Sequence, residues 1–162
     1  EEGQMEMVKL LLNKGADVNV TATTNGATAL MMASQEGRME VVKLLLNKGA
    51  DVNVTATTNG TTALIVASEE GHTEVVKLLL NKGADINVKL TTNGATALMM
   101  ASQEGHMEVV KLLLDKGADV DAKLTTDGAT ALMIASKNGH IDVVMLLSLR
   151  SQGLDYGIEE QY

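Results

Sequence analysis

Residues 25–58 read NGATALMMASQEGRMEVVKLLLNKGADVNVTATT, and closely similar stretches follow at residues 59–92 and 93–126. Residues 93–126 match the first stretch at all but six of 34 positions. Such a fixed period predicts a solenoid, in which each small unit stacks on the next because it cannot bury its apolar faces alone. In the same register, residues 1–24 hold the second half of a unit, and residues 127–150 hold a unit without its final loop. We therefore expect a repeat array over residues 1–150 and a non-repeat tail over residues 151–162.

Each unit predicts two helices followed by a loop. Thr28 is a suitable N-cap for the first helix, whose apolar residues recur at helical spacing until Gly37 ends it. The second helix, expected over roughly residues 39–48, has an apolar arc too wide for a helix lying on one surface. We therefore expect its partner helix and both neighbouring units to cover it. Gly49 ends this helix, and residues 50–59 form a polar, threonine-rich loop that closes in an Asn-Gly turn.

The composition excludes several classes of function. Phe, Trp and Pro are absent and Tyr156 and Tyr162 are the only aromatic residues, which indicates small, regular, repeated packing. A net charge of −8 argues against nucleic acid and against acidic membranes as partners. There is no cysteine for a disulfide or a thiolate site, and no apolar stretch approaches the ~20 residues that span a bilayer. The opening EEGQMEMVKLLL lacks a signal-like segment, which favours the cytoplasm while leaving the compartment unknown.

Residues 28–54 read TALMMASQEGRMEVVKLLLNKGADVNV, and this run resembles an ankyrin repeat, whose signature is T-P-L-H-x-A on a period of 33. The similarity recurs in every unit, to about residue 149. It implies an all-α fold, an ankyrin-repeat solenoid of stacked helix-turn-helix units with projecting β-hairpin-like loops. It also implies protein–protein interaction, with no catalytic role and no cofactor.

The chain departs from the signature in two ways. Its Pro-Leu-His core reads Ala-Leu-Met at residues 29–31 and 97–99, and Ile65 replaces the histidine in the unit between them. This removes the hydrogen bond that the family's histidine contributes around the threonine and the loop. The period is 34, and the extra residue lies in the loop, so each projecting finger should be one residue longer than the family norm.

The three histidines of the chain recur 34 residues apart and could suggest a metal site: His72, His106 and His140. Successive units lie at least one helix-packing distance apart, about 8–10 Å, whereas metal ligands lie within about 2.1 Å of one ion. The resemblance implies instead that each histidine bridges to loop backbone between units. We therefore expect a structural role and no metal.

Other recurring side chains also receive structural interpretations. A catalytic carboxylate pair needs two unlike environments in one cleft, whereas the GAD motif places its aspartates at equivalent loop positions along a rod. These aspartates are Asp17, Asp51, Asp85 and Asp119. We expect most of the ten methionines to fill the core, including those at residues 31, 39, 99, 107 and 133.

The resemblance also selects candidate partner-binding positions, at the fingertips and along the first helices, which face a concave groove in this family. The expected fingertips are Thr24, Asn25, Thr58, Asn59, Thr92, Asn93, Thr126 and Asp127. The expected apolar stripe is Met32, Val66, Met100 and Ile134. Its expected polar flanks are Gln35, Glu36, Glu69, Glu70, Gln103, Glu104, Lys137 and Asn138. This surface predicts a protein or peptide partner with apolar anchors and basic flanks.

Alternative functions remain open at this stage. The array could be a structural spacer, an end-to-end assembly module, or the targeting array of a larger enzyme or effector. Met7, Val8, Leu11 and Leu12 lack the first helix of their unit in this sequence. If the sequence is cut from a longer array, the rest of that array covers them, whereas a genuine, uncapped N-terminal end should self-associate. The tail is expected to be disordered, or else to dock through the alternating residues Leu154, Tyr156 and Ile158.

Overall fold

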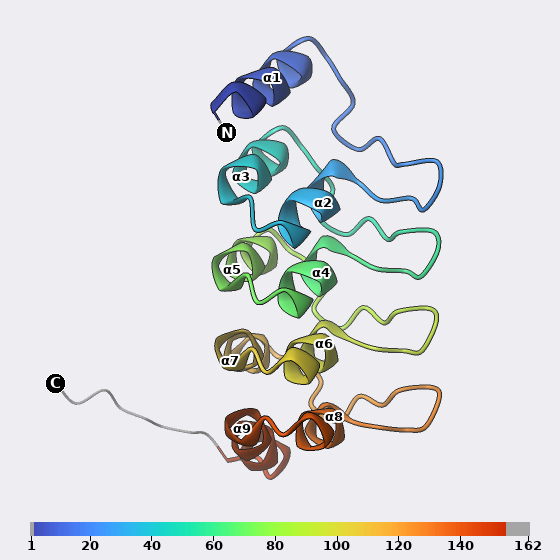
Figure 1. The fold of residues 1–162 in the computed structure, drawn as a ribbon, viewed down its shortest axis with the longest axis vertical. Helices are drawn as coiled ribbons and strands as arrows, with labels where there is room; N and C mark the ends of the chain where they lie inside the picture. The colour runs from blue at the N-terminus through green and yellow to red at the C-terminus, as the bar shows by residue number, and fades with distance from the viewer. Residues whose placement is uncertain (1, 155–162) are drawn as a thin grey trace, which may run out of the picture.

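The structure is a computed structural model that describes residues 2–154, with side chains from residue 5 onward, and the regular secondary structure of this part of the chain is α-helical apart from one isolated β-bridge. Two rows of helices run along the stack, with loops projecting to one side (Figure 1). The inner row consists of α2 (Ala29–Gln35), α4 (Ala63–Glu69), α6 (Ala97–Glu104) and α8 (Ala131–Asn138). The outer row consists of α1 (Glu2–Asn13), α3 (Met39–Asn47), α5 (Thr73–Asn81), α7 (Met107–Asp115) and α9 (Ile141–Ser151). The expected all-α solenoid is confirmed.

Threonine hydroxyls start the inner helices. Thr28 has extended backbone, with φ −97° and ψ 163°, and its Oγ1 accepts a hydrogen bond from the Met31 N–H at 3.2 Å. Thr62, Thr96 and Thr130 cap their helices in the same way. The cap satisfies an N–H group that has no partner within the first helical turn. The N-cap predicted from the sequence is therefore confirmed, and it needs no histidine at the third helical position.

Stacking of the inner helices buries the side chain at that third helical position. Met31, Ile65 and Met99 are almost fully buried, whereas Met133 is 60% exposed. Of these four residues, Met133 is the one whose helix has no following unit packed against it within the described residues. The predicted core role of Met133 is therefore wrong, because no neighbouring helix covers its side chain. Burial at this position depends on the neighbouring unit.

The projecting loops, which we call the fingers, are hairpin-shaped. Within the described residues, one isolated antiparallel bridge joins Thr21 to Thr28 in the first finger. The second finger is closed by the Ala56 N–H, which donates to the Thr61 carbonyl at 2.8 Å. Successive fingers are also joined: the Thr57 N–H donates to the Asn25 carbonyl at 2.9 Å, with equivalent bonds further along. The fingers therefore form a connected wall.

Asparagines at the base of the fingers link each unit to the next. The Asn53 Oδ1 accepts from the Asp85 N–H at 2.8 Å, and its Nδ2 donates to the Gly83 carbonyl at 3.1 Å. Asn19 makes the same two bonds one unit earlier. The last finger has Asp121 at the equivalent position, and its carboxyl group lacks the N–H with which the asparagines donate to the next unit. This ladder of hydrogen bonds spaces the units at their outer edge.

The last helix of the outer row within the described residues is α9, which runs to Ser151. The Leu154 N–H donates to the Leu149 carbonyl at 3.0 Å, and Gly153 has φ +72°, as in a helix C-cap. Residues 151–154 therefore complete the last helix. Leu154 is exposed, and Tyr156 and Ile158, the other two residues expected to dock, lie outside the described residues.

Candidate functional site

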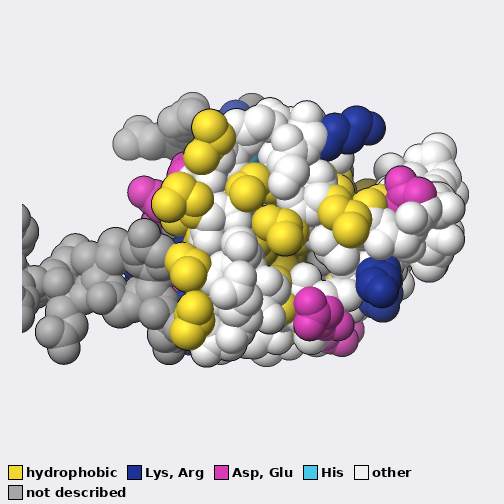
Figure 2. Space-filling model, turned by 90° about the horizontal axis from the view of Figure 1, so that it is seen from below, with side chains coloured by type: hydrophobic (Ala, Val, Ile, Leu, Met, Phe, Trp, Pro, Cys, Tyr) yellow, Lys and Arg dark blue, Asp and Glu magenta, His cyan; other side chains and the backbone are white. Residues whose placement is uncertain are grey.

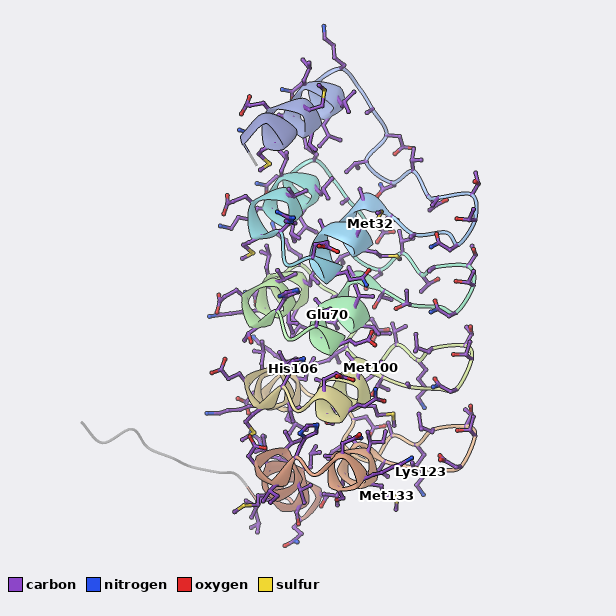
Figure 3. The ribbon with its side chains drawn as sticks, viewed as in Figure 1. Met32, Glu70, Met100, His106, Lys123 and Met133 are labelled. Carbon is purple, nitrogen blue, oxygen red and sulfur yellow. The ribbon has the colours of Figure 1, made fainter. Side chains whose placement is uncertain are left out.

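The predicted site residues lie along one side of the stack, on the inner helices and on the fingers beside them. We call these exposed residues the inner surface. Figure 3 shows Met32 on α2, Met100 on α6 and Lys123 on the last finger. The surface passes through every unit that has an inner helix, and within the described residues a finger follows each of these units except the last.

The predicted fingertip residues divide into two kinds. The threonines Thr24, Thr58, Thr92 and Thr126 are exposed. The Asn25 Oδ1 accepts from the Ala27 N–H at 3.0 Å, and the Asn or Asp residues in the other fingers make the same bond. These are the predicted residues Asn59, Asn93 and Asp127. Each of these Asn or Asp side chains therefore stabilises its own turn. A partner would contact mainly the polar atoms of the side chain that this bond does not use.

The predicted apolar stripe is uneven. Met32 is 62% exposed, whereas Val66, Met100 and Ile134 are half-buried, and Met100 and Ile134 pack against the core. The preceding unit covers these three positions in part, and no inner helix precedes α2 within the described residues. The stripe is therefore fully accessible only at its N-terminal end.

Acidic and amide side chains follow the stripe at the ends of the inner helices. Glu36, Glu70, Gln35, Gln103 and Glu104 are exposed. In the last unit the two equivalent positions hold Lys137 and Asn138, both exposed. The inner surface is therefore acidic over most of its length and basic at its C-terminal end.

Glu69 is the one half-buried carboxylate in this row. Burial raises the pKa of Glu69 above its ordinary value, and the neighbouring charges of Glu70 and Glu104 raise the pKa further. Glu104 belongs to the following unit, so stacking brings the carboxylates of successive units together. A cationic partner group placed here would relieve this repulsion.

The three histidines link successive units through hydrogen bonds to backbone carbonyls at the ends of the inner helices. The His72 Nε2–H donates to the Gln35 carbonyl at 2.9 Å, and the His106 Nε2–H donates to the Glu69 carbonyl at 2.9 Å. His140 makes the same bond to Gln103 at 2.8 Å. The predicted bridging role is confirmed, although the acceptor lies on the preceding inner helix and not on a loop.

The GAD aspartates stabilise turns. The Asp51 Oδ1 accepts from the Asn53 N–H at 2.9 Å, and Asp17, Asp85 and Asp119 make the equivalent bond. Within the described residues, no three His, Cys, Asp or Glu side chains lie close enough together to hold a metal ion. These carboxylates are spread along the stack, one per unit.

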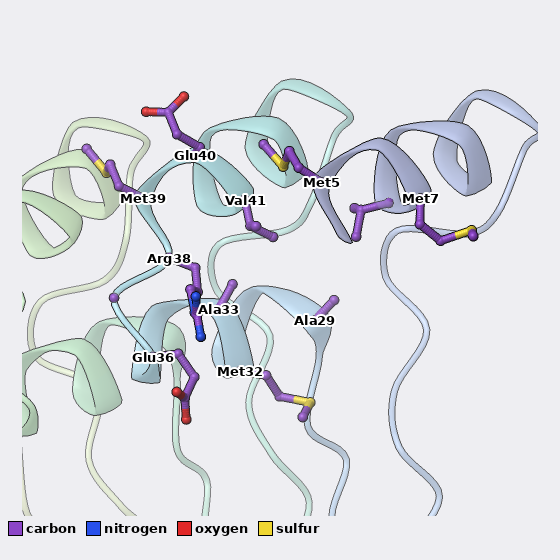
Figure 4. Close-up of a pocket in the computed structure, with 12 residues that line it drawn as sticks. Met5, Met7, Ala29, Met32, Ala33, Glu36, Arg38, Met39, Glu40 and Val41 are labelled. Carbon is purple, nitrogen blue, oxygen red and sulfur yellow. The ribbon is translucent and has the colours of Figure 1, made fainter. Parts of the chain in front are cut away.

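A groove of about 1040 Å³ lies beside α1, at the N-terminal end (Figure 4). Its apolar lining comes from α1, α2 and α3 and includes Met7, Met32 and Val41. The sequence predicted poor cover for Met7 and Leu11, which are both more than half exposed, and for Val8 and Leu12, which are half-buried. It did not predict that Met32 would share the same groove. The missing signal was spatial, because α1 and α2 belong to different units.

Comparison with known families accounts for the whole array. The family model for ankyrin repeats (three copies) matches residues 1–90 and again residues 88–159. A search of curated proteins gives no match. Within residues 2–154, no helix is long and apolar enough to cross a membrane. The two matched ranges and the stacked helix-turn-helix units agree, and the chain belongs to the ankyrin-repeat family.

Proposed function

We propose that this chain is a protein-interaction scaffold that binds a segment of a partner protein along its inner surface. Ankyrin repeats are generally non-catalytic modules for protein–protein interaction. The single observation that carries the proposal is the row of exposed acidic side chains beside a partly exposed apolar stripe. Such a strip suits a partner with apolar anchors and basic flanks.

The raised pKa of Glu69 supports this partner chemistry. The charges of Glu70 and Glu104 disfavour a charged Glu69 in the free protein. A lysine or arginine of the partner would gain attraction to all three and would remove that repulsion. The strongest electrostatic contact should therefore lie over α4 and α6.

The fingers contribute a second set of contacts. Their exposed threonines and their linked backbone form a rigid edge, so little conformational entropy is lost when a partner binds there. Because the inner surface has no large aromatic residue to serve as a hot spot, affinity should come from many modest contacts.

Charge reversal on the inner surface tests the proposal. The variant Glu70→Lys/Glu104→Lys changes two exposed residues at the ends of inner helices. We expect it to lose a partner that the original chain retains in an affinity pull-down. Its matched control is Glu74→Lys/Glu108→Lys, which changes two exposed glutamates in the first turns of α5 and α7.

The two variants carry the same net charge, so a non-specific charge effect would weaken both equally. Equal loss in both variants, or equal retention in both, would contradict binding at the inner surface. If neither the original chain nor the control retains any partner, the structural-spacer function is favoured instead. Attachment of the array to a separate enzyme or effector would use the same surface for targeting and would give the same result as the proposal.

A further inference from the structure

Charge is repeated differently on the two sides of the stack. Two rows on the outer helices keep the same sign in every unit from α3 to α9. The acidic row is Glu40, Glu74, Glu108 and Asp142, and the basic row is Lys48, Lys82, Lys116 and Arg150. On the inner surface, in contrast, one position holds in turn Gln35, Glu69, Gln103 and Lys137. Charges that are constant along the stack suit solvation, whereas charges that change from unit to unit suit recognition of a particular partner.

The inner surface is most acidic at α4. This helix ends beside Glu69 and Glu70, and the finger before it holds the uncharged Thr55 at the position where the next two fingers hold lysine. Burial raises the pKa of Glu69, and the charges of Glu70 and Glu104 raise it further. A positive group of a partner would therefore be attracted most strongly to this part of the surface.

The inner surface is most basic at α8. Lys137 lies in the last turn of this helix, Lys123 lies on the finger before it, and both are exposed. Figure 3 shows Glu70, Met100 and Lys123 following one another down the stack. Seen from the C-terminal end of the described stack, apolar side chains cover much of the end face, and the prominent Lys and Arg side chains lie toward the finger (Figure 2). Asp127, at the tip of this finger, accepts a hydrogen bond from the Ala129 N–H of its own turn at 3.0 Å.

Charges of opposite sign accompany each other at the other two inner helices. At α6 the exposed Lys89 on the finger offsets Glu104 at the helix end, and the half-buried Met100 belongs to the same helix. At α2, Glu36 and Arg38 line the same groove. The net charge of the inner surface is therefore concentrated at α4, where it is negative, and at α8, where it is positive.

One partner segment is able to contact both charged regions. Successive inner helices pack about 8–10 Å apart, so α4 and α8 lie roughly 16–20 Å apart. An extended chain covers that distance with about five or six residues, and a helix covers it with about 11–13 residues. A short linear segment of either kind is therefore long enough.

We propose that the inner surface binds a partner segment whose charge changes sign along its length. Lysine or arginine lies over α4, apolar residues lie over Met100, and aspartate or glutamate lies over α8 and the finger before it. This inference rests on the proposed function and narrows it, because only one flank of the partner is then basic. The segment binds in one direction, since its reversal would bring like charges together. The same repulsion rejects segments that are basic or acidic throughout.

Peptide selection on the full chain tests this partner chemistry. The probe is a phage-displayed library of random peptides of about 16 residues, long enough for either conformation. Enriched peptides should carry a basic group and an acidic group separated by apolar residues. Their dissociation constants are then measured with synthetic, fluorescently labelled copies by fluorescence anisotropy.

Two charge reversals separate the two regions. Glu70→Lys/Glu104→Lys changes the acidic region, and Lys123→Glu/Lys137→Glu changes the basic one. Each variant should weaken binding of the enriched peptides about tenfold, because two exposed charge contacts become repulsive. The matched control for the second variant is Lys77→Glu/Lys111→Glu, which reverses two exposed lysines of α5 and α7 and should leave the dissociation constant unchanged. Circular dichroism should show the same helix content in all variants.

Failure of this inference is distinguishable from failure of the proposed function. Peptides that are basic at both flanks, and whose binding depends on Glu70 and Glu104 but not on Lys123 and Lys137, would overturn the inference and leave the proposed function in place. Binding that depends only on the two lysines would overturn the inference together with the proposed basic partner. Loss in the outer-helix control equal to that in Lys123→Glu/Lys137→Glu would overturn the inference as a non-specific charge effect. Enrichment of no peptide, or binding unchanged in every variant, would count against both.

Discussion

Glu69 shows how one residue departs from its repeat. The equivalent residues in the neighbouring units are Gln35 and Gln103, so a glutamine is compatible with this position. Because Glu69 is half-buried beside Glu70 and Glu104, the folded state raises its pKa. The folded protein therefore disfavours the ionised form, and stability falls as the pH rises from the ordinary pKa of glutamate through the raised value.

Replacing Glu69 by glutamine should therefore stabilise the protein at pH 7, by less than about 1 kcal/mol because the site is partly solvated. The gain should disappear below about pH 4, where the carboxyl is protonated in both the folded and unfolded states. Urea unfolding at pH 7 and at low pH measures both values. Glu74→Gln, an exposed change of equal charge on α5, is the control and should have little effect at either pH. A gain for Glu69→Gln that persists at low pH would point to packing and not to charge.

At the scale of the elements, close approach between units depends on two neighbouring residues. Gly71 follows α4 with φ +75°, and a Cβ atom there would lie 2.6 Å from the His106 ring of the next unit. The same ring donates to the Glu69 carbonyl, so glycine and histidine together set the distance between successive inner helices. Gly83 follows α5 with φ +87°, and a Cβ atom there would meet no heavy atom of another part of the chain within 4 Å.

These two glycines separate backbone strain from steric contact. Gly83→Ala should lower the free energy of unfolding by about 1 kcal/mol, the cost of a left-handed residue with a Cβ atom. Gly71→Ala should cost roughly 1–2 kcal/mol more, because the His106 ring must move and its hydrogen bond is lost. Chemical denaturation of both variants gives the difference. Equal losses would show that the ring shifts freely and does not fix the spacing.

At the scale of the whole molecule, each unit is stabilised mainly by its immediate neighbours. The inner helices contact one another in sequence, α2 with α4, α4 with α6 and α6 with α8. Within the described residues, the units containing α4 to α7 have neighbours on both sides, whereas α1 has no inner helix beside it. A stack with nearest-neighbour interfaces therefore opens from its ends.

Native-state hydrogen exchange should detect this gradient. Amides of α1 should exchange fastest among the helices, and amides in α4 to α7 should be the most protected. Uniform protection along the array would contradict opening from the ends and would indicate a single cooperative unit.

Local features of the fold followed directly from the sequence. The period, the two helices of each unit and the threonine caps depend on residues close together in the chain, and these patterns recur in every unit. The resemblance to ankyrin repeats also supplied the positions of the candidate site. It could not reveal that the Asn25 Oδ1 is used within its own turn, or that Glu69 and Glu104 lie together, since those contacts depend on side-chain placement and on the next unit.

Burial was decided by stacking. Met31 and Met133 occupy the same position in nearly identical local sequences, yet one is 4% exposed and the other 60%. Leu11 and Leu45 differ for the same reason, because an inner helix covers only Leu45. A helix propensity or an apolar period is a property of a few consecutive residues, whereas cover is supplied by residues about 34 positions away. Whether a repeated side chain becomes core or exposed surface therefore depends on its place in the stack, and only the assembled units establish that place.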